Sequence, residues 1–270
     1  MKVFLYVNKA KDEKQIYTKQ IVSILENEKI EYEFVDGSVT KKDGDALIVF
    51  GGDGTILKLN KFAYLNSLPI ITINAGTIGF LTEFELHDIA DAIKCLLSGK
   101  LIRDVRTNIA IYTEDRCYIA LNEAVVQRVF SEKDEGIVSN LTVNVDNNDI
   151  ETVVGDGVIV ATQTGSTAYS LSAGGAVLAP GVDAFQITAI APHSFSNRPI
   201  VCSSQKTIKI TNTGDNNTAL FVDGRFVETV KKGQVITIVK AKKDTVFLRK
   251  ASFNFYDRLI VKLNRGGVKI

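Results

Sequence analysis

The chain has 270 residues, of which 45% are hydrophobic and 23% are charged, and its formal net charge is +1 at pH 7. This length allows two modest domains, each with a core of its own. Because Lys and Arg nearly balance Asp and Glu, the composition argues against a general nucleic-acid-binding protein, which usually has a strongly basic surface.

The three cysteines are widely separated and odd in number, so they predict neither a disulfide framework nor a zinc site. We expect all three to be small buried residues. The N-terminal segment Met1–Val7 is too short for a signal peptide's apolar core or a membrane span. We therefore expect a cytoplasmic protein that contacts neither membrane nor nucleic acid.

The first 100 residues alternate strand and helix patterns. Apolar runs predict strands at Val3–Val7, Tyr32–Val35, Ala46–Phe50 and Ile70–Ile73. Helical spacing predicts helices near Lys14–Glu28, Thr55–Leu65 and Asp88–Leu97. This alternation predicts a doubly wound, Rossmann-like α/β domain over residues 1–100.

The segment Phe50–Thr55 places one carboxylate, Asp53, in a glycine-rich turn between an apolar strand and a helix. Ligands bind at the carboxyl ends of strands in open α/β sheets, and glycines there allow close approach to a phosphate. In phosphoryl transfer a carboxylate takes a proton from the attacking hydroxyl or helps to hold a divalent metal. The alternative is that Asp53 only forms a turn or caps the helix.

From about Leu101 the pattern changes to short, closely spaced apolar runs separated by turn residues. Strands are predicted at Asn108–Tyr112, Cys117–Leu121, Ala124–Val129, Leu141–Val145, Val158–Ala161, Thr207–Ile210, Ala219–Val222, Val235–Val239 and Val246–Leu248. Residues 101–252 are thus predicted to form a β-rich, sandwich-like domain with one helix near Ala168–Ala173. The tail, residues 253–270, contains helical spacing and is expected to pack back on the first domain.

A second polar segment, Thr164–Gly175, follows the strand Val158–Ala161. Its hydroxyls, its glycines and the ring of Tyr169 suit a sugar and a base, whereas the alternative is a simple helix cap. Asn122 and Glu123 place an amide beside a carboxylate between two predicted strands. The amide could bind a base edge and the carboxylate ribose hydroxyls, whereas the alternative is an ordinary surface turn. Asp223-Gly224 has the sequence of a tight hairpin turn.

Taken together, these segments resemble the NAD kinase family across nearly the whole chain. The matching segments follow the family's order: Gly51–Thr55, Asn74–Leu81, Asn122-Glu123, Gly155–Gly157, Thr164–Gly175, Ala191–Ser194 with Arg198-Pro199, and Val222–Gly224. Gly-Gly-Asp-Gly alone is shared with lipid kinases, so the run Thr164–Gly175 is the specific signal.

The resemblance implies an enzyme that phosphorylates the 2′-hydroxyl of the adenosine ribose of NAD to give NADP. ATP or another polyphosphate would be the donor. A divalent cation, usually magnesium, would be bound mainly through the donor phosphates rather than by ligands from the chain. Asp53 would be the proton acceptor.

The resemblance also implies a set of substrate-binding residues. They are Gly54, Leu57, Phe80, Asn122, Glu123, Asp156, Thr164, Thr167, Ala168, Tyr169, Ser170, Leu171, Ser172, Ala191 and Asp223. Asp156 and Ala191 would meet the nicotinamide half, often from a neighbouring subunit, which implies a homodimer or homotetramer.

The chain departs from the family pattern at three positions. Gln163 stands where Pro is common, Ile78 where Leu is common, and Val154 where a basic residue often precedes Gly-Asp-Gly. Arg225 is a candidate to replace that cation. Two other functions remain open at this point: a lipid kinase, which would need an apolar mouth for acyl chains, and a nucleotide-binding regulator, which would not need Asp53.

Overall fold

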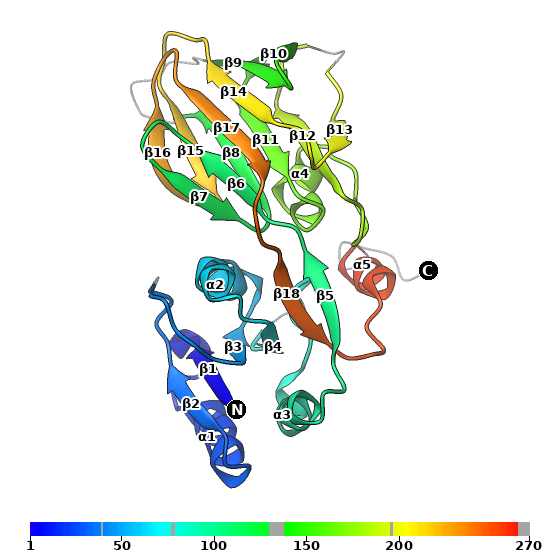
Figure 1. Ribbon diagram of the computed structural model, residues 1–270. Coiled ribbons are helices and arrows are strands. Elements are labelled where there is room, and N and C mark those ends of the chain that lie inside the picture. Colours follow the sequence, from blue (N-terminus) through cyan, green and yellow to red (C-terminus); the bar gives the residue numbers. More distant parts are fainter. Residues whose placement is uncertain (39, 77–78, 130–137, 195–196, 264–270) are drawn as a thin grey trace. The chain divides into compact units, whose positions relative to one another are not determined.

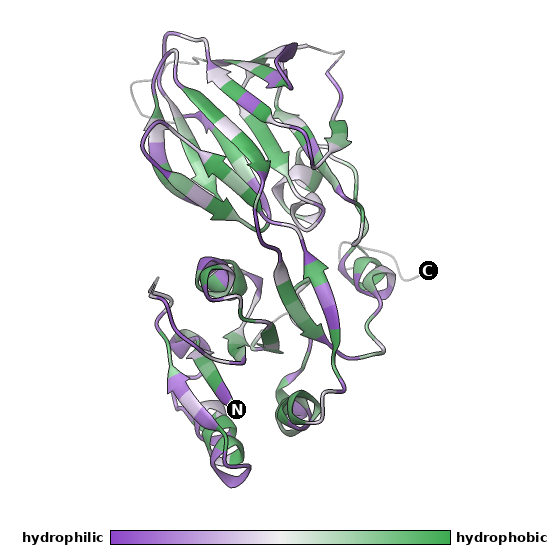
Figure 2. Ribbon diagram, in the orientation of Figure 1, coloured by the Kyte–Doolittle hydropathy of each residue, from purple (hydrophilic) through white to green (hydrophobic). Residues whose placement is uncertain are grey.

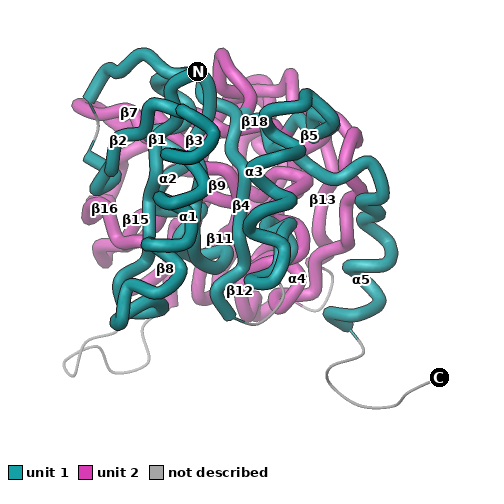
Figure 3. The backbone as a smooth tube through the Cα atoms, turned by 90° about the horizontal axis from the view of Figure 1, so that it is seen from below, with its two compact units in different colours: residues 1–105, 245–270 teal, residues 106–244 magenta. Residues whose placement is uncertain are grey.

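The computed structural model describes residues 1–38, 40–76, 79–129, 138–194 and 197–263. The chain separates into two compact units, which Figure 3 draws in different colours. Unit 1 comprises Met1–Val105 and the chain from Thr245 onward, and unit 2 comprises Arg106–Asp244.

Unit 1 is built on a six-stranded sheet with the order β2-β1-β3-β4-β18-β5 (Figure 1). Its strands are β1 (Lys2–Val7), β2 (Glu31–Phe34), β3 (Ala46–Gly51), β4 (Ile70–Asn74), β5 (Ile102–Arg106) and β18 (Thr245–Arg249). Its helices are α1 (Ile16–Asn27), α2 (Asp53–Asn66), α3 (Ile89–Leu97) and α5 (Phe255–Leu263), with short 3₁₀ turns at η1 (Lys9–Lys11) and η2 (Leu86–Asp88). Neighbouring strands from β2 to β18 run parallel.

Helices cover both faces of this sheet. Successive side chains of a strand point to opposite faces, so β1 contributes apolar side chains to both. Val3 and Leu5 of β1 share a core with residues of α1 and α3. Phe4, between them, meets Phe62 of α2 edge to face, with the ring centroids 5.7 Å apart. The doubly wound α/β fold predicted from the sequence is confirmed.

Strand β18 lies in a different place from the one predicted. The pattern assigns Val246–Leu248 to the β-rich domain, but β18 lies between β4 and β5 in the sheet of unit 1. Phe247 is fully buried there and pairs with Ile70 of β4. A short apolar run does not reveal its partner when that partner lies far away in the sequence, so the pattern could not place this strand.

The tail helix α5 packs on unit 1, as predicted. The ring of Phe255 lies 6.3 Å from that of Phe80, centroid to centroid. Arg258 of α5 donates to the carbonyl oxygen of Gly79 at 3.0 Å.

Unit 2 contains two antiparallel sheets, each with six strands among the described residues. One has the order β10-β9-β14-β17-β6-β7 and the other β13-β12-β11-β8-β15-β16. The strands are β6 (Ile109–Tyr112), β7 (Cys117–Ala120), β8 (Glu123–Arg128), β9 (Ser139–Val145), β10 (Asn148–Gly155), β11 (Gly157–Ala161), β12 (Ala184–Ile190), β13 (Ile200–Ser203), β14 (Ile208–Asn212), β15 (Thr218–Val222), β16 (Arg225–Val230) and β17 (Val235–Lys240). The helical segments are η3 (Gly165–Thr167) and α4 (Tyr169–Ser172).

The two sheets enclose one apolar core, to which Ile111, Leu141 and Ile208 contribute from the first sheet and Val126, Val160 and Phe185 from the second. Apolar and polar residues alternate along many of these strands in Figure 2, as expected for sheets buried on one face. The β-rich, sandwich-like domain is therefore confirmed.

Strands β5, β10, β12, β13 and β16 lie outside the segments that the sequence patterns indicate. Strand β12 is the instructive case, because it is central and buried yet carries the polar residues Gln186 and Thr188 inside. Both side chains hydrogen-bond to Ser170. These buried polar residues interrupt the apolar run that would otherwise mark a strand.

Two predicted turns are present. Asp146 and Asn147 have φ values of 49° and 68°, and Asp223 and Gly224 have 47° and 74°. Positive φ at both central residues suits the tight hairpins that join β9 to β10 and β15 to β16.

The cysteine prediction is wrong. Cys117 is exposed at the edge of its sheet, and Cys95 and Cys202 are half-buried. Among the described residues, no helix combines the length and apolar character needed to cross a membrane.

Candidate functional site

Asp53 is the first residue of α2, and Gly52 precedes the helix without any side-chain cap. The carboxylate of Asp53 points instead at a neighbouring segment, where it accepts the backbone N–H of Phe80 at 2.8 Å and that of Leu81 at 3.1 Å. The interpretation of Asp53 as a helix cap is therefore wrong. Two donors fix the orientation of a half-buried carboxylate beside an open, glycine-flanked turn.

Gly79 is required by this arrangement. A Cβ atom at Gly79 would fall on the carboxylate of Asp53, whereas Cβ atoms at Gly52 and Gly54 would meet no other atom within 4 Å. The Gly79 N–H also donates to Thr82 Oγ1 at 3.1 Å. Gly79 thus lets the backbone approach Asp53, and the other two glycines leave the turn open to a ligand.

Two arginines from the end of the chain hold the segment that contacts Asp53. Arg249 is completely buried, donates to the carbonyl oxygen of Leu81 at 2.9 Å and pairs with Asp104 at 3.0 Å. Its guanidinium lies 4.4 Å from the ring centroid of Phe253. Arg258 holds the carbonyl of Gly79 in the same way. Both arginines were missed by sequence reasoning, since a single basic residue carries no pattern in the sequence.

In unit 2, Asp223 organises the turn that carries Asn122 and Glu123. Its carboxylate accepts backbone N–H groups from Leu121 at 2.9 Å, from Asn122 at 2.7 Å and from Glu123 at 3.3 Å. The hairpin interpretation of Asp223-Gly224 describes the backbone correctly, but the side chain also holds a second turn. Burial raises the pKa of Asp223 to about 6, and the three N–H groups and Arg225 oppose that rise.

Glu123 is buried, with only 4% of its surface exposed, and its Oε2 atom has no hydrogen-bond partner. Desolvation, together with the negative charge of Asp223, raises the pKa of Glu123 to about 8. Asn122 is also buried, and its Oδ1 atom lacks a partner. An unsatisfied buried polar atom costs about 1–3 kcal/mol, so such atoms require an explanation.

The segment Gln163–Thr167 lies directly against this turn. Thr162 donates its N–H to the carbonyl of Asn122 and its hydroxyl to the carbonyl of Leu121. Gly165 approaches Asn122 so closely that a Cβ atom there would overlap its backbone. Thr164 Oγ1 and Gln163 Oε1 are buried without partners. Two adjacent segments therefore carry four buried oxygens without partners, and we call the residues Asn122, Glu123, Gln163 and Thr164 the polar cradle.

The other predicted site residues in Thr164–Gly175 differ in how far their side chains are exposed and already hydrogen-bonded. Ser170 is fully buried, and its hydroxyl is engaged with Thr188 and Gln186. Thr167 donates to the carbonyl of Thr164 at 3.1 Å. The remaining predicted residues of this segment are partly or fully exposed: Ala168, Tyr169, Leu171 and Ser172. Gln163 was not among the predicted site residues, although its place in the family pattern marked it as unusual.

Asp156 and Ala191 meet where β10, β11 and β12 join. The N–H of Asp156 donates to the carbonyl of Ile190, and a Cβ atom at Gly155 would overlap the backbone of Ala191. Arg128 Nε lies 2.8 Å from Asp156 Oδ1, so Asp156 has a cation beside it even though Val154 is apolar. Arg225 lies instead beside Asp223. Asp156 also helps to raise the pKa of Tyr169, after desolvation.

The structure thus brings the predicted residues together in two groups. Unit 1 holds Asp53 and Gly54 with Phe80, while Leu57 is half-buried on α2. Unit 2 holds the polar cradle, Asp223 and the Asp156–Ala191 corner. Ile78 lies outside the described residues. Within the described ranges no three His, Cys, Asp or Glu side chains cluster as a metal site would require.

Comparison with known proteins identifies both halves of the chain. A family model described as the ATP-NAD kinase N-terminal domain matches residues 3–101, and one described as the ATP-NAD kinase C-terminal domain matches residues 121–250. Both describe a kinase, and the protein is therefore a phosphotransferase enzyme.

The NAD kinase of Caldicellulosiruptor bescii is 34% identical over 265 residues, which cover 97% of this chain and 99% of that relative. The chain belongs to the NAD kinase family. A solved NAD kinase from Archaeoglobus fulgidus, in complex with ATP, superposes with a TM-score of 0.79 at 26% identity. The match covers 99% of this chain and 100% of the Archaeoglobus chain. Yeast NADH kinase complexed with NADH has a TM-score of 0.83 at 23% identity, with 100% of this chain and 89% of that chain covered, which is a likeness of fold.

Proposed function

We propose that the enzyme transfers a phosphoryl group from ATP or another polyphosphate to the 2′-hydroxyl of the adenosine ribose of NAD, giving NADP. The observation that carries this proposal is the polar cradle of unit 2, in which buried oxygens of Asn122, Glu123, Gln163 and Thr164 have no partner. A nucleoside offers donors for such atoms in its exocyclic amino group and its ribose hydroxyls.

Asn122 Oδ1 would accept from the adenine amino group, and Glu123 would accept from ribose hydroxyls. Each contact removes the cost of an unsatisfied buried oxygen, which is about 1–3 kcal/mol. This gain is made only by a ligand with correctly placed donors, so these four oxygens would give the cradle selectivity. The exposed ring of Tyr169 beside this segment would cover an apolar face of the ligand.

Asp53 is the proposed proton acceptor. As the 2′-oxygen forms its bond to the terminal phosphorus of the donor, the bond from that phosphorus to the bridging oxygen breaks. The hydroxyl proton passes to the carboxylate of Asp53, and with ATP the other product is ADP. A carboxylate is a weak base for an alcohol, so its orientation by Phe80 N–H and Leu81 N–H supports a role that depends on placement.

A magnesium ion is proposed as the metal cofactor. The donor set of the chain fits this only in part, because Asp53 is the one carboxylate placed at the glycine turn and it belongs to no metal-binding cluster among the described residues. Magnesium commonly takes most of its ligands from substrate phosphates and water. When bound in this way the ion would neutralise charge on the donor phosphates.

The nicotinamide half would meet Asp156 and Ala191, contributed by a neighbouring subunit in a homodimer or homotetramer. The φ of 43° at Ala191 supports a functional role, since strained backbone in non-glycine residues gathers at ligand sites. The strand β13 lies at the edge of its sheet with Ile200 and Val201 exposed, which supports association with a further chain. Light scattering coupled to gel filtration would give the subunit count.

The test is to incubate the protein with NAD, magnesium and either ATP or polyphosphate, and to measure NADP with a dehydrogenase specific for it. NADP formation with at least one donor is expected. Absence of NADP with both donors, from protein that is folded and binds NAD, would reject the proposal. A parallel assay with NADH as acceptor would define the preference between the two acceptors.

A further inference from the structure

The carboxylate of Asp53 is held by two consecutive peptide groups. The N–H that lies 2.8 Å from Asp53 Oδ2 belongs to the peptide joining Gly79 to Phe80. The N–H that lies 3.1 Å from Asp53 Oδ1 belongs to the next peptide, which joins Phe80 to Leu81. Both peptides are trans and planar, so the carbonyl oxygen of each points away from the carboxylate that its N–H faces. The orientation of Asp53 therefore depends on what holds these two carbonyl oxygens.

An arginine from the end of the chain contacts each of the two carbonyls. Arg258 of α5 donates from Nη1 to the carbonyl oxygen of Gly79 at 3.0 Å. Arg249 Nη2 lies 3.5 Å from the carbonyl oxygen of Phe80. A cation at a carbonyl oxygen polarises the peptide and strengthens the hydrogen bond that its N–H donates. The two guanidinium groups thus act on Asp53 from the far side of the same two peptides.

The two arginines differ in what else depends on them. Arg249 is completely buried, and its loss is expected to affect the fold. Arg258 comes from a helix in which no residue is buried, and its side chain is 17% exposed. The carboxylate of Glu83 lies 3.5 Å from Arg258 and 3.4 Å from Arg249, so without Arg258 it would still have a cation beside it. Arg258 can therefore be replaced without leaving an unpaired buried charge.

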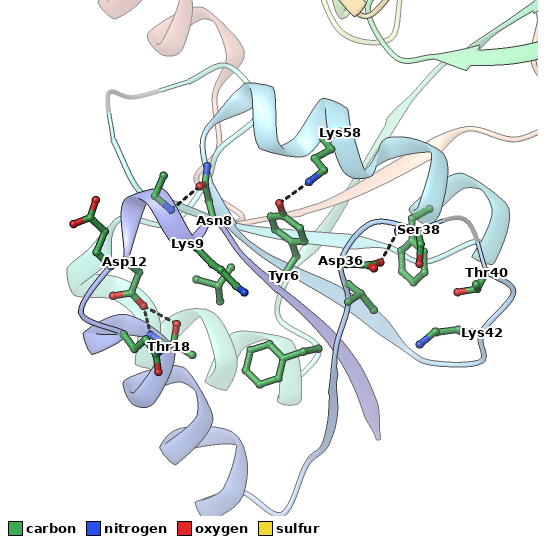
Figure 4. Close-up of a pocket in the computed structure, with 17 residues that line it drawn as sticks. Tyr6, Asn8, Lys9, Asp12, Thr18, Asp36, Ser38, Thr40, Lys42 and Lys58 are labelled. Carbon is green, nitrogen blue, oxygen red and sulfur yellow. Dashed lines mark hydrogen bonds between the residues drawn. The ribbon is translucent and has the colours of Figure 1, made fainter. Parts of the chain in front are cut away.

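The turn that carries Asp53 is held independently of α5. Asn8, which is labelled in Figure 4, lies in the wall of a pocket of about 1010 Å³. Its N–H donates to the carbonyl of Phe50 at 3.0 Å, and its Nδ2 donates to Thr55 Oγ1 at 3.1 Å. Among the described residues, none from α5 lines this pocket. Loss of Arg258 should therefore leave the glycine turn in place and release only the carboxylate.

One face of α5 is directed at the segment that holds Asp53. The ring of Phe255 lies 6.3 Å from that of Phe80, centroid to centroid, and Lys262 Nζ lies 5.8 Å from the same centroid. Phe255, Arg258 and Lys262 have the spacing i, i+3 and i+7, which places them on one side of a helix. The side chains and the backbone of the segment are thus held by the same helix.

We propose that Arg258 is a positioning residue for phosphoryl transfer, which holds the Gly79–Phe80 peptide so that its N–H fixes the carboxylate of Asp53. The inference rests on the proposed function, in which Asp53 accepts the proton of the hydroxyl. Arg258 acts through the peptide and has no need to touch a substrate. A helix at the end of the chain would in this way control the rate of a reaction at the glycine turn.

The first test compares Arg258→Met and Arg258→Lys with wild type and with the control Arg103→Met, which removes an exposed arginine of β5. Arg258→Met is expected to lower kcat about ten- to a hundredfold, the usual cost of a misplaced reacting group, while the Kd for NAD stays unchanged. Arg258→Lys keeps a cationic donor and should recover most of the loss. The control should behave as wild type.

Circular dichroism must show that each variant is folded. Should the methionine variant fail to fold, Arg258→Gln keeps a neutral donor at this position, and it should lower kcat by a smaller factor.

A double-mutant cycle separates positioning from a general structural effect. In an Asp53→Asn background, the further change Arg258→Met should lower kcat by less than about twofold, because the group on which Arg258 acts is already lost. A structural effect would lower kcat by the same factor in both backgrounds. Equal factors would therefore overturn the inference.

Amide hydrogen exchange measured by NMR gives a readout that needs no turnover. The N–H groups of Phe80 and Leu81 should exchange faster in Arg258→Met than in wild type, and at the wild-type rate in Arg103→Met. Unchanged exchange in Arg258→Met, or a wild-type kcat for this variant, would overturn the inference and leave the proposed function standing. A wild-type kcat for Asp53→Asn would instead reject the proposed proton acceptor, and the positioning role with it.

Discussion

Asp223 and Glu123 meet at one buried corner of unit 2, where an oxygen of the Asp223 carboxylate accepts the backbone N–H of Glu123 at 3.3 Å. Burial, and then the charge of Asp223, raises the pKa of Glu123 to about 8. The residue proposed to accept from ribose hydroxyls is therefore mostly protonated at neutral pH in the empty protein.

The affinity for NAD should consequently depend on pH. Below about pH 8 the ionised fraction of Glu123 falls about tenfold per pH unit, so the Kd for NAD should rise between pH 8 and pH 6 and be nearly constant above pH 8.5. Calorimetry in buffers of different ionisation enthalpy should also detect proton release on binding at pH 7. In Glu123→Gln the change in Kd between pH 8 and pH 7 and the proton release at pH 7 should vanish.

The raised pKa of Glu123 also predicts how the stability of the protein without ligand depends on pH. Its folded-state pKa of about 8 exceeds the ordinary value of 4.5, so the folded state holds the proton more tightly than the unfolded state. Its contribution to the free energy of unfolding should fall as pH rises from about 4.5 through about 8. Melting temperatures of wild type and Glu123→Gln should therefore diverge between pH 6 and pH 8.5, with the variant more stable at the higher pH.

Asp223→Ala should weaken NAD binding about tenfold or more, because three N–H groups of the turn lose their acceptor and Asn122 and Glu123 lose their placement. Asp223→Asn is the matched comparison. It keeps an acceptor for the N–H groups of Asn122 and Glu123 and tolerates the φ of 47°, so it should retain more affinity. Equal losses in the two variants would mean that charge, rather than the turn, is what Asp223 provides.

Asp53→Asn should reduce kcat by about 10²–10⁴-fold, the usual range for a positioned proton acceptor, without changing the Kd for NAD. The thermal melting of the variant must match wild type for this comparison, because an amide can accept only one of the two N–H groups. A variant with wild-type kcat would exclude Asp53 as the proton acceptor.

Gly79→Ala should abolish most activity while NAD binding to unit 2 persists, because its methyl group would displace the Asp53 carboxylate. Gly76→Ala is the control on the same segment. A Cβ atom at Gly76 meets only the end of the Lys11 side chain, at 3.9 Å, so this change should be tolerated. Steady-state kinetics with NAD and ATP would compare the two.

Arg249→Met should destabilise the protein by about 3–5 kcal/mol, because it removes the buried guanidinium that pairs with Asp104 and Glu83. Lys250→Met breaks a more exposed pair with Asp88 and should cost at most about 1 kcal/mol. Urea denaturation followed by circular dichroism would measure both. Similar costs would show that the burial of Arg249 has little energetic effect.

The sequence patterns predict those structural features that depend on a few neighbouring residues. The glycine turn at Asp53, the hairpin at Asp223 and the apolar strands β1, β3 and β4 can all be predicted from short segments. The place of β18, the use of Arg249 and the anchoring of Asn122 by Asp223 depend on residues about 100 or more positions apart. A single sequence contains no signal for such pairings.

The insertion of β18 between β4 and β5 has a consequence for the order of folding. The sheet of unit 1 lacks the strand between β4 and the edge strand β5 until Thr245–Arg249 has been synthesised, whereas unit 2 is continuous from Arg106 to Asp244. Chains emerge from the ribosome N-terminus first, and domains fold as units. The second unit can therefore fold before the first is complete, and a chain truncated before β18 should contain a folded sandwich and an unfinished Asp53 site.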